Sequence, residues 1–456
     1  MATIPHPFLF RWDSVDQLGD LERLKLVLDA LPDEPLMQLL EADRGHGRND
    51  YPVRPMWNSL IAGFVFQHPS IAALRRELLR NGQLRDLCGF DPFDGAQAVP
   101  SEYAYTRFQR RLRKYQGQID ELFHSTLDEL RIELPDLGRV QALDGKELHS
   151  LANGPSSYPV PKDNKEDTDG RRDRDADWGV KGSGEKKGDK KGKGKKKGKK
   201  KHYWFGYLLH LVVDATYEVP LAFEVTKAST GEQPQAQRLL DQMQDRHPEL
   251  LHQCDRMSAD KGYDDHKLIN RLWQQHQIKP IIDIRNCWKD GEAEEDGVLT
   301  KLVSGQENVI YTHDGQVSCM CPRTGELHSM AYGGFEQDRE TLKYRCPARY
   351  SGITCKGMDR CPVSDAVRIP LAEDRRVFTP VARSSYRWQD FYDQRGAVER
   401  VNSRLAGGFG FERPGVRGLA KMQLRVTMAL TIMLAMALGR IRAGQPENLR
   451  SLVKPA

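Results

Sequence analysis

Features that would place the chain at a membrane are scarce in the sequence. The first residues, MATIPHPFLFRWDSV, lack a cationic segment followed by a long apolar run, so we expect no cleavable signal peptide. The most apolar stretch, VTMALTIMLAMAL at 426–438, is shorter than the roughly 20 residues that cross a bilayer. We therefore expect a buried C-terminal helix, no membrane partner and a cytoplasmic protein.

The chain also lacks a basic character spread over its whole length. Its formal net charge is +5, but residues 181–201 hold twelve lysines and two acidic residues, so the remainder sums to −5. A surface for a polyanion therefore has to be argued from local clusters of charge.

Cysteine is infrequent and unevenly placed. The chain has eight cysteines in 456 residues, and without a secretory signal they predict thiols or metal ligands rather than disulfides. Five of them fall in one segment: Cys319, Cys321, Cys346, Cys355 and Cys361. The Cys-Pro and glycine-rich knuckles resemble a zinc ribbon, but the spacings differ from paired C-x2-C. A structural Zn²⁺ site and reduced cysteines in a β-rich insertion both remain open.

The N-terminal region has helical periodicity. Apolar residues recur every three or four positions within 16–132, and Ser70 and Ser101 each precede such a run as N-cap candidates. The helix after Ser101 is strongly cationic through Arg107, Arg110 and Arg111, followed by Arg113 and Lys114. This side is either a solvated face or a surface that contacts phosphate.

Sequence patterns typical of β-strands, with apolar and polar residues in alternation or in short apolar runs, begin near residue 139. We expect strands at 139–145, 203–215, 218–229, 255–264 and 278–285, with the second and third forming an antiparallel hairpin, and helices over 232–247 and 265–276. The Lys/Gly-rich stretch cannot bury a core and is predicted to be disordered. The fold class is α/β, a mixed sheet flanked by helices.

The expected domain limits follow from these shifts in pattern. They are an all-helical domain at 1–132, an α/β domain at 133–415 that contains a disordered insertion at 157–201 and a cysteine-containing β-rich insertion at 286–380, and a C-terminal helix at 416–456.

Two aspartates share one local pattern. Asp144 and Asp260 each end an expected strand, and a glycine follows at position 145 or 262. Such strand ends are where an α/β sheet exposes side chains for chemistry, although Asp-Gly alone is an ordinary turn signal. Asp214 and Asp283 are rivals on neighbouring strands.

A glutamate lies in an arginine-rich helical segment near the C-terminus. Residues 383–425 hold nine Arg plus Lys against four Asp plus Glu. If 388–406 form one helix, Glu399 lies on a polar stripe with Tyr392 and Arg395, away from an apolar stripe. An Arg395–Glu399 salt bridge is one reading. The other is a metal ligand, since a lone carboxylate facing phosphates needs a compensating cation.

The spacing tyrosine, two residues, arginine, three residues, glutamate in YDQRGAVER resembles the signature around the catalytic glutamate of DDE transposases of bacterial insertion sequences. ALDGKELHS and SADKGYDDH resemble the contexts of that family's two aspartates. The stretch from Tyr51 to Phe90 is similar to the helical domain that precedes the catalytic core in one branch of the family.

The resemblance implies a ribonuclease-H-like core in which Asp144, Asp260 and Glu399 hold two Mg²⁺ or Mn²⁺ ions. It implies cleavage at the ends of an insertion sequence and joining of the 3′-OH to target DNA. Double-stranded DNA, as terminal inverted repeats and target, is then the partner, with a homodimer assembled on it in the nucleoid. The DNA-contacting residues that we infer are Tyr392, Arg395, Arg400, Arg404, Arg107, Arg110, Arg111 and Lys146.

The sequence departs from the family pattern at one position. The family usually has a lysine seven residues after the glutamate, where this chain has Ala406. An alternative function is therefore a catalytically decayed, sequence-specific DNA-binding protein. A third is a metal-dependent nuclease of the same fold that acts in repair.

Overall fold

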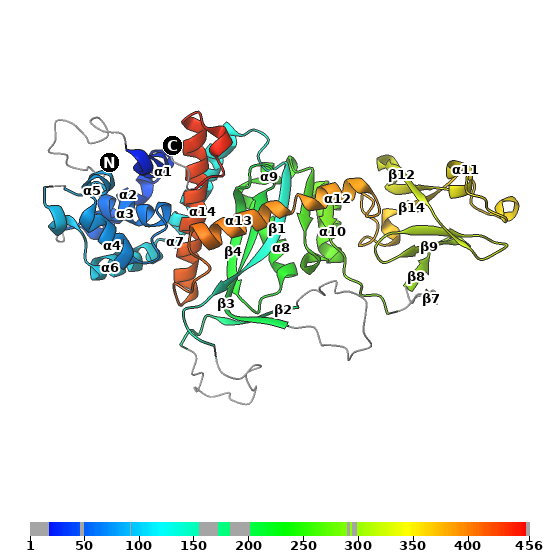
Figure 1. The fold of residues 1–456 in the computed structure, drawn as a ribbon, viewed down its shortest axis with the longest axis horizontal. Helices are drawn as coiled ribbons and strands as arrows, with labels where there is room; N and C mark the ends of the chain where they lie inside the picture. Colours follow the sequence, from blue (N-terminus) through cyan, green and yellow to red (C-terminus); the bar gives the residue numbers. More distant parts are fainter. Residues whose placement is uncertain are drawn as a thin grey trace.

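The chain folds into a helical cluster, a central mixed sheet and a β-rich module, arranged in a row (Figure 1). The computed structural model describes residues 18–45, 50–91, 93–154, 172–182, 201–289, 292–293 and 299–452. The central sheet lies between the other two parts, and helices α12 and α13 run across it in Figure 1.

The N-terminal region is helical, as predicted. Its helices are α1 (Glu22–Ala30), α2 (Glu34–Arg44), α3 (Val53–Val65), α4 (Ile71–Arg80), α5 (Gly82–Cys88), α6 (Glu102–Lys114) and α7 (Gln116–Glu133). The side chains of Ser70 and Ser101 accept hydrogen bonds from the backbone N–H groups of Ala73 and Ala104, which confirms both N-caps.

The central sheet has six strands. They are β1 (Val140–His149), β2 (Asp177–Gly182), β3 (Lys201–Asp214), β4 (Pro220–Lys227), β5 (Arg256–Ala259) and β6 (Lys279–Ile282). Strand β1 pairs antiparallel with β3 and parallel with β5, and β6 is parallel to β5. The predicted hairpin is confirmed as the antiparallel pair β3–β4.

Two expectations about this sheet were wrong. Strand β1 does not end at Asp144 but continues to His149, because every residue from Gln141 to His149 pairs with β3. Residues 177–182 lie inside the stretch predicted to be disordered, yet they form β2 on the edge of β3. The remainder of that tract, 157–171 and 183–200, lies outside the described residues.

Helices connect the parallel strands. They are α8 (Glu232–Arg246), the short α9 (Pro248–His252) and α10 (His266–His276), and η4 (Lys261–Tyr263) is a 3-10 turn directly after Asp260. Strand β5 therefore ends one residue before Asp260, and the expected strand over 255–264 is shorter than predicted.

The cysteine-containing insertion is β-rich, as predicted. It consists of β7 (Glu292–Ala293), β8 (Leu299–Leu302), β9 (Val309–Thr312), β10 (Val317–Met320), β11 (Leu327–Ser329), β12 (Ala331–Glu336), β13 (Thr341–Arg345), α11 (Pro347–Ser351) and β14 (Ala366–Pro370). Strands β7–β11 form one sheet and β12–β14 another. This module has its own hydrophobic core, which includes Val309, Leu342 and Ile369.

The segment that carries Glu399 is two helices rather than the single expected one. Helix α12 (Tyr386–Asp393) ends before Arg395, and α13 (Gly396–Ser403) begins after it. A π-helical turn, η8 (Arg404–Gly408), follows α13 and contains Ala406. The break places Arg395 at the N-terminus of α13.

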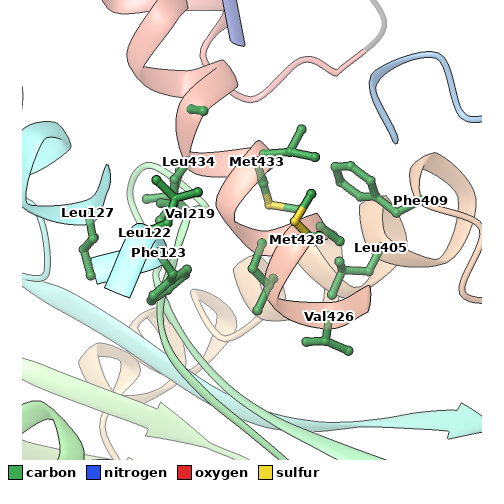
Figure 2. Packing of buried hydrophobic residues seen from close by; sticks show 14 of the residues in the cluster. Leu122, Phe123, Leu127, Val219, Leu405, Phe409, Val426, Met428, Met433 and Leu434 are labelled. Carbon is green, nitrogen blue, oxygen red and sulfur yellow. The ribbon is translucent and has the colours of Figure 1, made fainter. Parts of the chain in front are cut away.

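Helix α14 (Leu419–Arg442) is longer than the apolar run that we read from the sequence. Its 24 residues would suffice to span a membrane by length and composition, but 89% of its most apolar window is buried inside the protein. Figure 2 shows Leu434 of α14 on the side of Phe123 and Leu127 of α7, whereas Met433 lies on the side of Phe409. The helix also contacts α1, α3 and β4, so it is a core helix shared by the helical cluster and the sheet.

Candidate active site

The register of the parallel strands brings Asp144 and Asp260 together. Leu143 of β1 pairs with Ala259 of β5, so the next residue on each strand is one of the two aspartates. Side chains at matching positions of adjacent parallel strands lie side by side. The sequence prediction that these carboxylates are neighbours therefore follows from the sheet itself.

The electrostatics of Asp144 show how closely the acids gather. Burial, and then the negative charge of Asp260, raises the pKa of Asp144 to about 6, although Lys181 and Arg395 oppose the shift. Ionised carboxylates that lie close together and partly buried repel one another and lose hydration, so their charged forms are unfavourable unless a cation binds between them. Because hard divalent ions prefer oxygen ligands, these residues fit a Mg²⁺ or Mn²⁺ site.

Glu399 joins this group through Arg395. The guanidinium Nη1 of Arg395 lies 3.8 Å from Asp144 Oδ2, and Nη2 lies 2.5 Å from Glu399 Oε1. Arg395 is mostly buried, whereas the side chain of Glu399 is 58% exposed. The Arg395–Glu399 salt bridge expected from the sequence is present. Because Arg395 also approaches Asp144, it connects α13, the helix that carries Glu399, to strand β1.

Sequence reasoning missed a fourth carboxylate. Burial, and then the charge of Asp260, raises the pKa of Glu232 to about 7, and Asp144 adds to the shift. Glu232 is the first residue of α8. An acid in the first turn of a helix is common because it complements the helix dipole, so no sequence signal could single it out.

Two further groups at the site were also missed. Lys181 of β2 donates from Nζ to the carbonyl of Gly145 at 3.1 Å. Lys181 was counted only as part of the charged tract. The hydroxyl of Tyr263 is buried and has no hydrogen-bond partner within the described residues.

The inferred DNA-contacting residues next to the site have different surroundings. Tyr392 stacks on Trp388 with ring centroids 4.9 Å apart. Lys146 lies two residues beyond Asp144 on β1, and burial lowers its pKa against the opposing effect of Glu412. Their contact with DNA stays a prediction.

Arg400 and Arg404 face Glu218 rather than the acidic group. Arg400 Nε donates to Glu218 Oε1 at 2.7 Å, and Arg404 donates to the carbonyl oxygen of Glu218. Arg450 Nη1 approaches the same carboxylate at 3.3 Å. Burial lowers the pKa of Arg404 to about 10. Arg404 therefore has a packing role, and Arg400 is the more accessible of the two.

The cationic helix α6 lies in the helical cluster. Arg107 lies over the ring of Tyr103, 4.6 Å from its centroid, and the side chain of Tyr103 is exposed. Arg110 is exposed, and Arg111 pairs with Asp43 at 3.1 Å. The surface of α6 thus presents Arg107 and Arg110 to solvent, whereas Arg111 is partly neutralised.

The two rival aspartates, Asp214 and Asp283, have different surroundings in the structure. Asp214 accepts hydrogen bonds from the N–H groups of Thr216, Tyr217 and Gly138, so it stabilises the hairpin turn. Asp283 follows β6, and Ala259 pairs with Ile282, so Asp283 lies beside Asp260 at the same sheet edge. Only Asp283 borders the acidic group.

Another acidic group lies at the contact of α7 and α9. The ligand atoms of Asp128, His247 and Glu249 lie within 4.8 Å of one another and could hold a metal ion. Arg131 pairs with both carboxylates, at 3.0 Å from Asp128. Their charge is therefore already compensated by the guanidinium of Arg131.

The five cysteines of the β-rich module line one small cavity together with His328. The Cys321 sulfur accepts hydrogen bonds from the Thr324 hydroxyl and from the N–H groups of Arg323 and Thr324, which lowers the pKa of Cys321 to about 6. Burial, and then Cys346, Cys361 and Cys355, raises the pKa of Cys319 to about 11. The thiols thus face one another across the cavity.

An acidic site directly after the paired segments of two adjacent parallel strands, within a mixed sheet flanked by helices, defines a class of α/β proteins with chemistry on the sheet. Residues 175–435 match the family described as the transposase DDE domain, and the chain belongs to that family. The match includes Asp260 and Glu399 and begins after Asp144. No curated protein and no solved structure matches the chain.

Membership of this family makes the chain a transposase, a protein of DNA transposition and recombination that acts on DNA. The mixed α/β sheet is consistent with a ribonuclease-H-like transposase domain. Divalent metals are the cofactors of this family, and the crowded carboxylates at 144 and 260 fit them.

Proposed function

We propose that this transposase cuts DNA at the ends of an insertion sequence and joins the freed 3′-OH to target DNA. Asp144, Asp260 and Glu399 would hold two divalent cations on a ribonuclease-H-like core. The observation that carries the proposal is the parallel register of β1 and β5, which sets two aspartates side by side at a sheet edge. Arg395 connects that edge to Glu399.

The bound cations would supply charge stabilisation at the scissile phosphate and activation of water or a 3′-OH. The chain's own residues do the positioning. Asp144 and Asp260 are fixed by the sheet, and the Arg395 guanidinium can donate to a backbone phosphate from beside them. Tyr392, held by its stacking on Trp388, orients the same strand of DNA.

The parts of the chain have separate roles in this proposal. The helical region 1–132 binds double-stranded DNA through α6, the region 133–415 carries the chemistry, and the region 416–456 anchors both through α14. Two copies pair two terminal repeats in a homodimer on DNA. The exposed guanidinium groups of Arg107 and Arg110 support the first of these roles.

The cysteine cavity supports a structural Zn²⁺ site in the β-rich module. Backbone N–H groups directed at the Cys321 sulfur stabilise a thiolate, which is the form that binds metal. Cys355 accepts from the N–H of Gly357 and contacts Cys321. Four ligands would come from Cys321, Cys355, Cys346 and either Cys361 or Cys319. Zinc there would fix the module beside the segment that leads into α12.

A nicking assay with Mg²⁺ on DNA that carries the sequences flanking the gene tests the proposed chemistry. Asp260→Asn and Glu399→Gln should each lower cleavage at least about 100-fold, because each removes a charged metal ligand. Asp393→Asn is the matched control, since Asp393 is an exposed acid of α12 that only accepts from Gln389. Undiminished nicking by Glu399→Gln would contradict the assignment.

The same assay separates the alternatives. Specific DNA binding without nicking by the wild-type chain would identify the decayed DNA-binding protein, which the alanine at 406 favours. Nicking without strand transfer would identify a nuclease.

A further inference from the structure

The two glycines next to the catalytic aspartates make room for the carboxylate of Glu232. A methyl group placed on Gly145 would lie 3.0 Å from Glu232 Oε1. A methyl group on Gly262 would overlap Glu232 Oε2 and would lie 2.8 Å from Asp260 Oδ1. The carboxylate of Glu232 therefore lies against the backbone that follows Asp144 and against the backbone that follows Asp260.

The side chain of Tyr263 independently indicates that a ligand belongs at this place. Tyr263 is fully buried, and its hydroxyl has no hydrogen-bond partner within the described residues. The hydroxyl lies 3.5 Å from the position of a Gly145 methyl group, on the side where Glu232 lies. Buried hydroxyls are normally paired, so an orphaned one points to a group that this site receives, such as a metal-bound water.

Among the described residues, no positive side chain forms a close ion pair with Glu232 that would explain its position. Lys181 donates to the carbonyl of Gly145, and Arg285 donates to the carbonyl of Asp264 at 3.1 Å. Both cations lie close enough to act on Glu232 through space, but each is engaged with backbone oxygen. A divalent cation is the partner that a carboxylate between two aspartates lacks.

We propose that Glu232 is a fourth carboxylate ligand of the divalent-metal site, and that it reaches Asp144 and Asp260 from helix α8. The inference rests on the proposed function, because it takes the two aspartates as metal ligands. It gives the metal site a ligand on α8, an element separate from the helix α13 that carries Glu399. The exposed Glu399 then completes the site from the other helix.

Calorimetric measurement of Mn²⁺ binding to the full-length protein, in the absence of DNA, tests whether Glu232 is a metal ligand. Glu232→Gln should weaken Mn²⁺ binding at least about tenfold and should reduce the rise in Tm that Mn²⁺ produces. Asp241→Asn is the matched control, because Asp241 is on the same helix but pairs with Arg271 at 2.7 Å. It should bind Mn²⁺ as the wild type does.

Asp144→Asn distinguishes the inference from the proposed function. Wild-type affinity in Glu232→Gln with weakened affinity in Asp144→Asn overturns the inference alone. Wild-type affinity in both variants overturns the inference and the proposed metal site together. If Glu232→Gln does not fold, Glu232→Asp decides, because the side chain is one methylene shorter and withdraws the carboxylate from Gly145 and Gly262 without changing any charge. A tenfold loss in that variant supports the proposal, and wild-type affinity overturns it.

Discussion

At the scale of single residues, Arg395 is the charged side chain that connects two of the candidate metal ligands. It lies between the carboxylates of Asp144 and Glu399, and it is mostly buried although it carries a full charge. Under the proposed function an arginine there would serve two purposes, since it would hold the acids in the metal-free protein and donate to DNA phosphate once cations bind the carboxylates.

We expect Arg395→Gln to lower DNA nicking at least about tenfold, because the variant loses both the link to Asp144 and a phosphate donor. The measurement is the rate of Mg²⁺-dependent nicking at saturating DNA. Arg387→Gln is the control, because Arg387 is exposed on α12 and lies over the ring of Phe391. Equal rates for the two variants would remove Arg395 from the site.

The pKa of Asp144 predicts how pH affects the metal-free protein. Its folded-state pKa, about 6, is above the ordinary value of 3.8, so the folded state holds a proton that the unfolded state releases between these values. The contribution of Asp144 to stability should therefore fall as pH rises from about 4 to about 6.

Thermal unfolding of the wild type and of Asp144→Asn in EDTA at pH 4.5 and pH 7 measures this effect, and between these pH values the Tm of the wild type should change in the unfavourable direction relative to that of the variant. Asp144→Asn should reduce the difference, because an asparagine does not titrate. Added Mn²⁺ should raise the Tm mainly at the higher pH, where the carboxylates are ionised. A pH effect of the same size in Asp144→Asn would assign it to other groups.

The sequence predicted the two aspartates and Glu399 because each lies in a recognisable local context. It could not predict that Glu232 and Lys181 lie at the site, because strand pairing brings Lys181 there and the packing of α8 brings Glu232 there. Lys181 is brought to Gly145 by the β2–β3 ladder, and the surrounding tract has no apolar pattern that predicts a strand. The contact of Arg404 with DNA stays a prediction, and no local pattern in the sequence predicts its contact with Glu218.

At the scale of elements, a close approach of two helix backbones joins α14 to α1. A methyl group on Gly439 would lie 2.6 Å from the carbonyl oxygen of Leu26. Backbone atoms cannot move away as a flexible side chain can, so this glycine sets the spacing between the two helices.

We expect Gly439→Ala to destabilise the protein by about 1–3 kcal/mol, the usual cost of forcing extra volume into a packed contact. Gly117→Ala in α7 is the control, because a methyl group there would meet no described atom within 4 Å. Its effect should stay within about 1 kcal/mol. Chemical denaturation of both variants provides the comparison, and equal stabilities would argue against close packing at Gly439.

The β-rich module provides a second prediction at this scale. If it binds zinc, the purified protein should contain about one equivalent, and Cys321→Ser should lose it, since two backbone N–H groups stabilise that thiolate. Cys287→Ser is the control, because Cys287 is exposed and does not line the cavity. Less than half an equivalent of zinc in the wild type would favour reduced cysteines.

Periodicity predicted the elements better than it predicted their ends. The caps at Ser70 and Ser101 and the β3–β4 hairpin are local features, so the sequence specified them. The extension of β1 beyond Asp144 depends on pairing with a distant strand, which local turn chemistry at Asp-Gly did not reveal. The break at Arg395 interrupts a pattern that otherwise reads as one helix.

At the scale of the whole molecule, α14 links two regions that the sequence presents as separate. Its buried side chains belong to one hydrophobic cluster with α1, α3, α7 and the sheet. The helical cluster and the central sheet should therefore unfold together, whereas the β-rich module has a separate core.

Leu434→Ala should cost about 3 kcal/mol, the usual cost of a cavity at a fully buried leucine. Hydrogen exchange should show faster exchange in both α1 and β4 in this variant, because both contact α14. The module strands β12–β14 are the internal control and should be unaffected. Faster exchange in α1 alone would show that the two regions are independent.

The position of α14 in the chain has a consequence for biosynthesis. The helix that fills the centre of the molecule leaves the ribosome after the helical cluster, the sheet and the segment with Glu399 have all emerged. A nascent chain can thus already contain Asp144, Asp260 and Glu399 and still lack α14, the helix on which the regions that carry them pack. The proposed site therefore gains the support of α14 only after residues 419–442 have been synthesised.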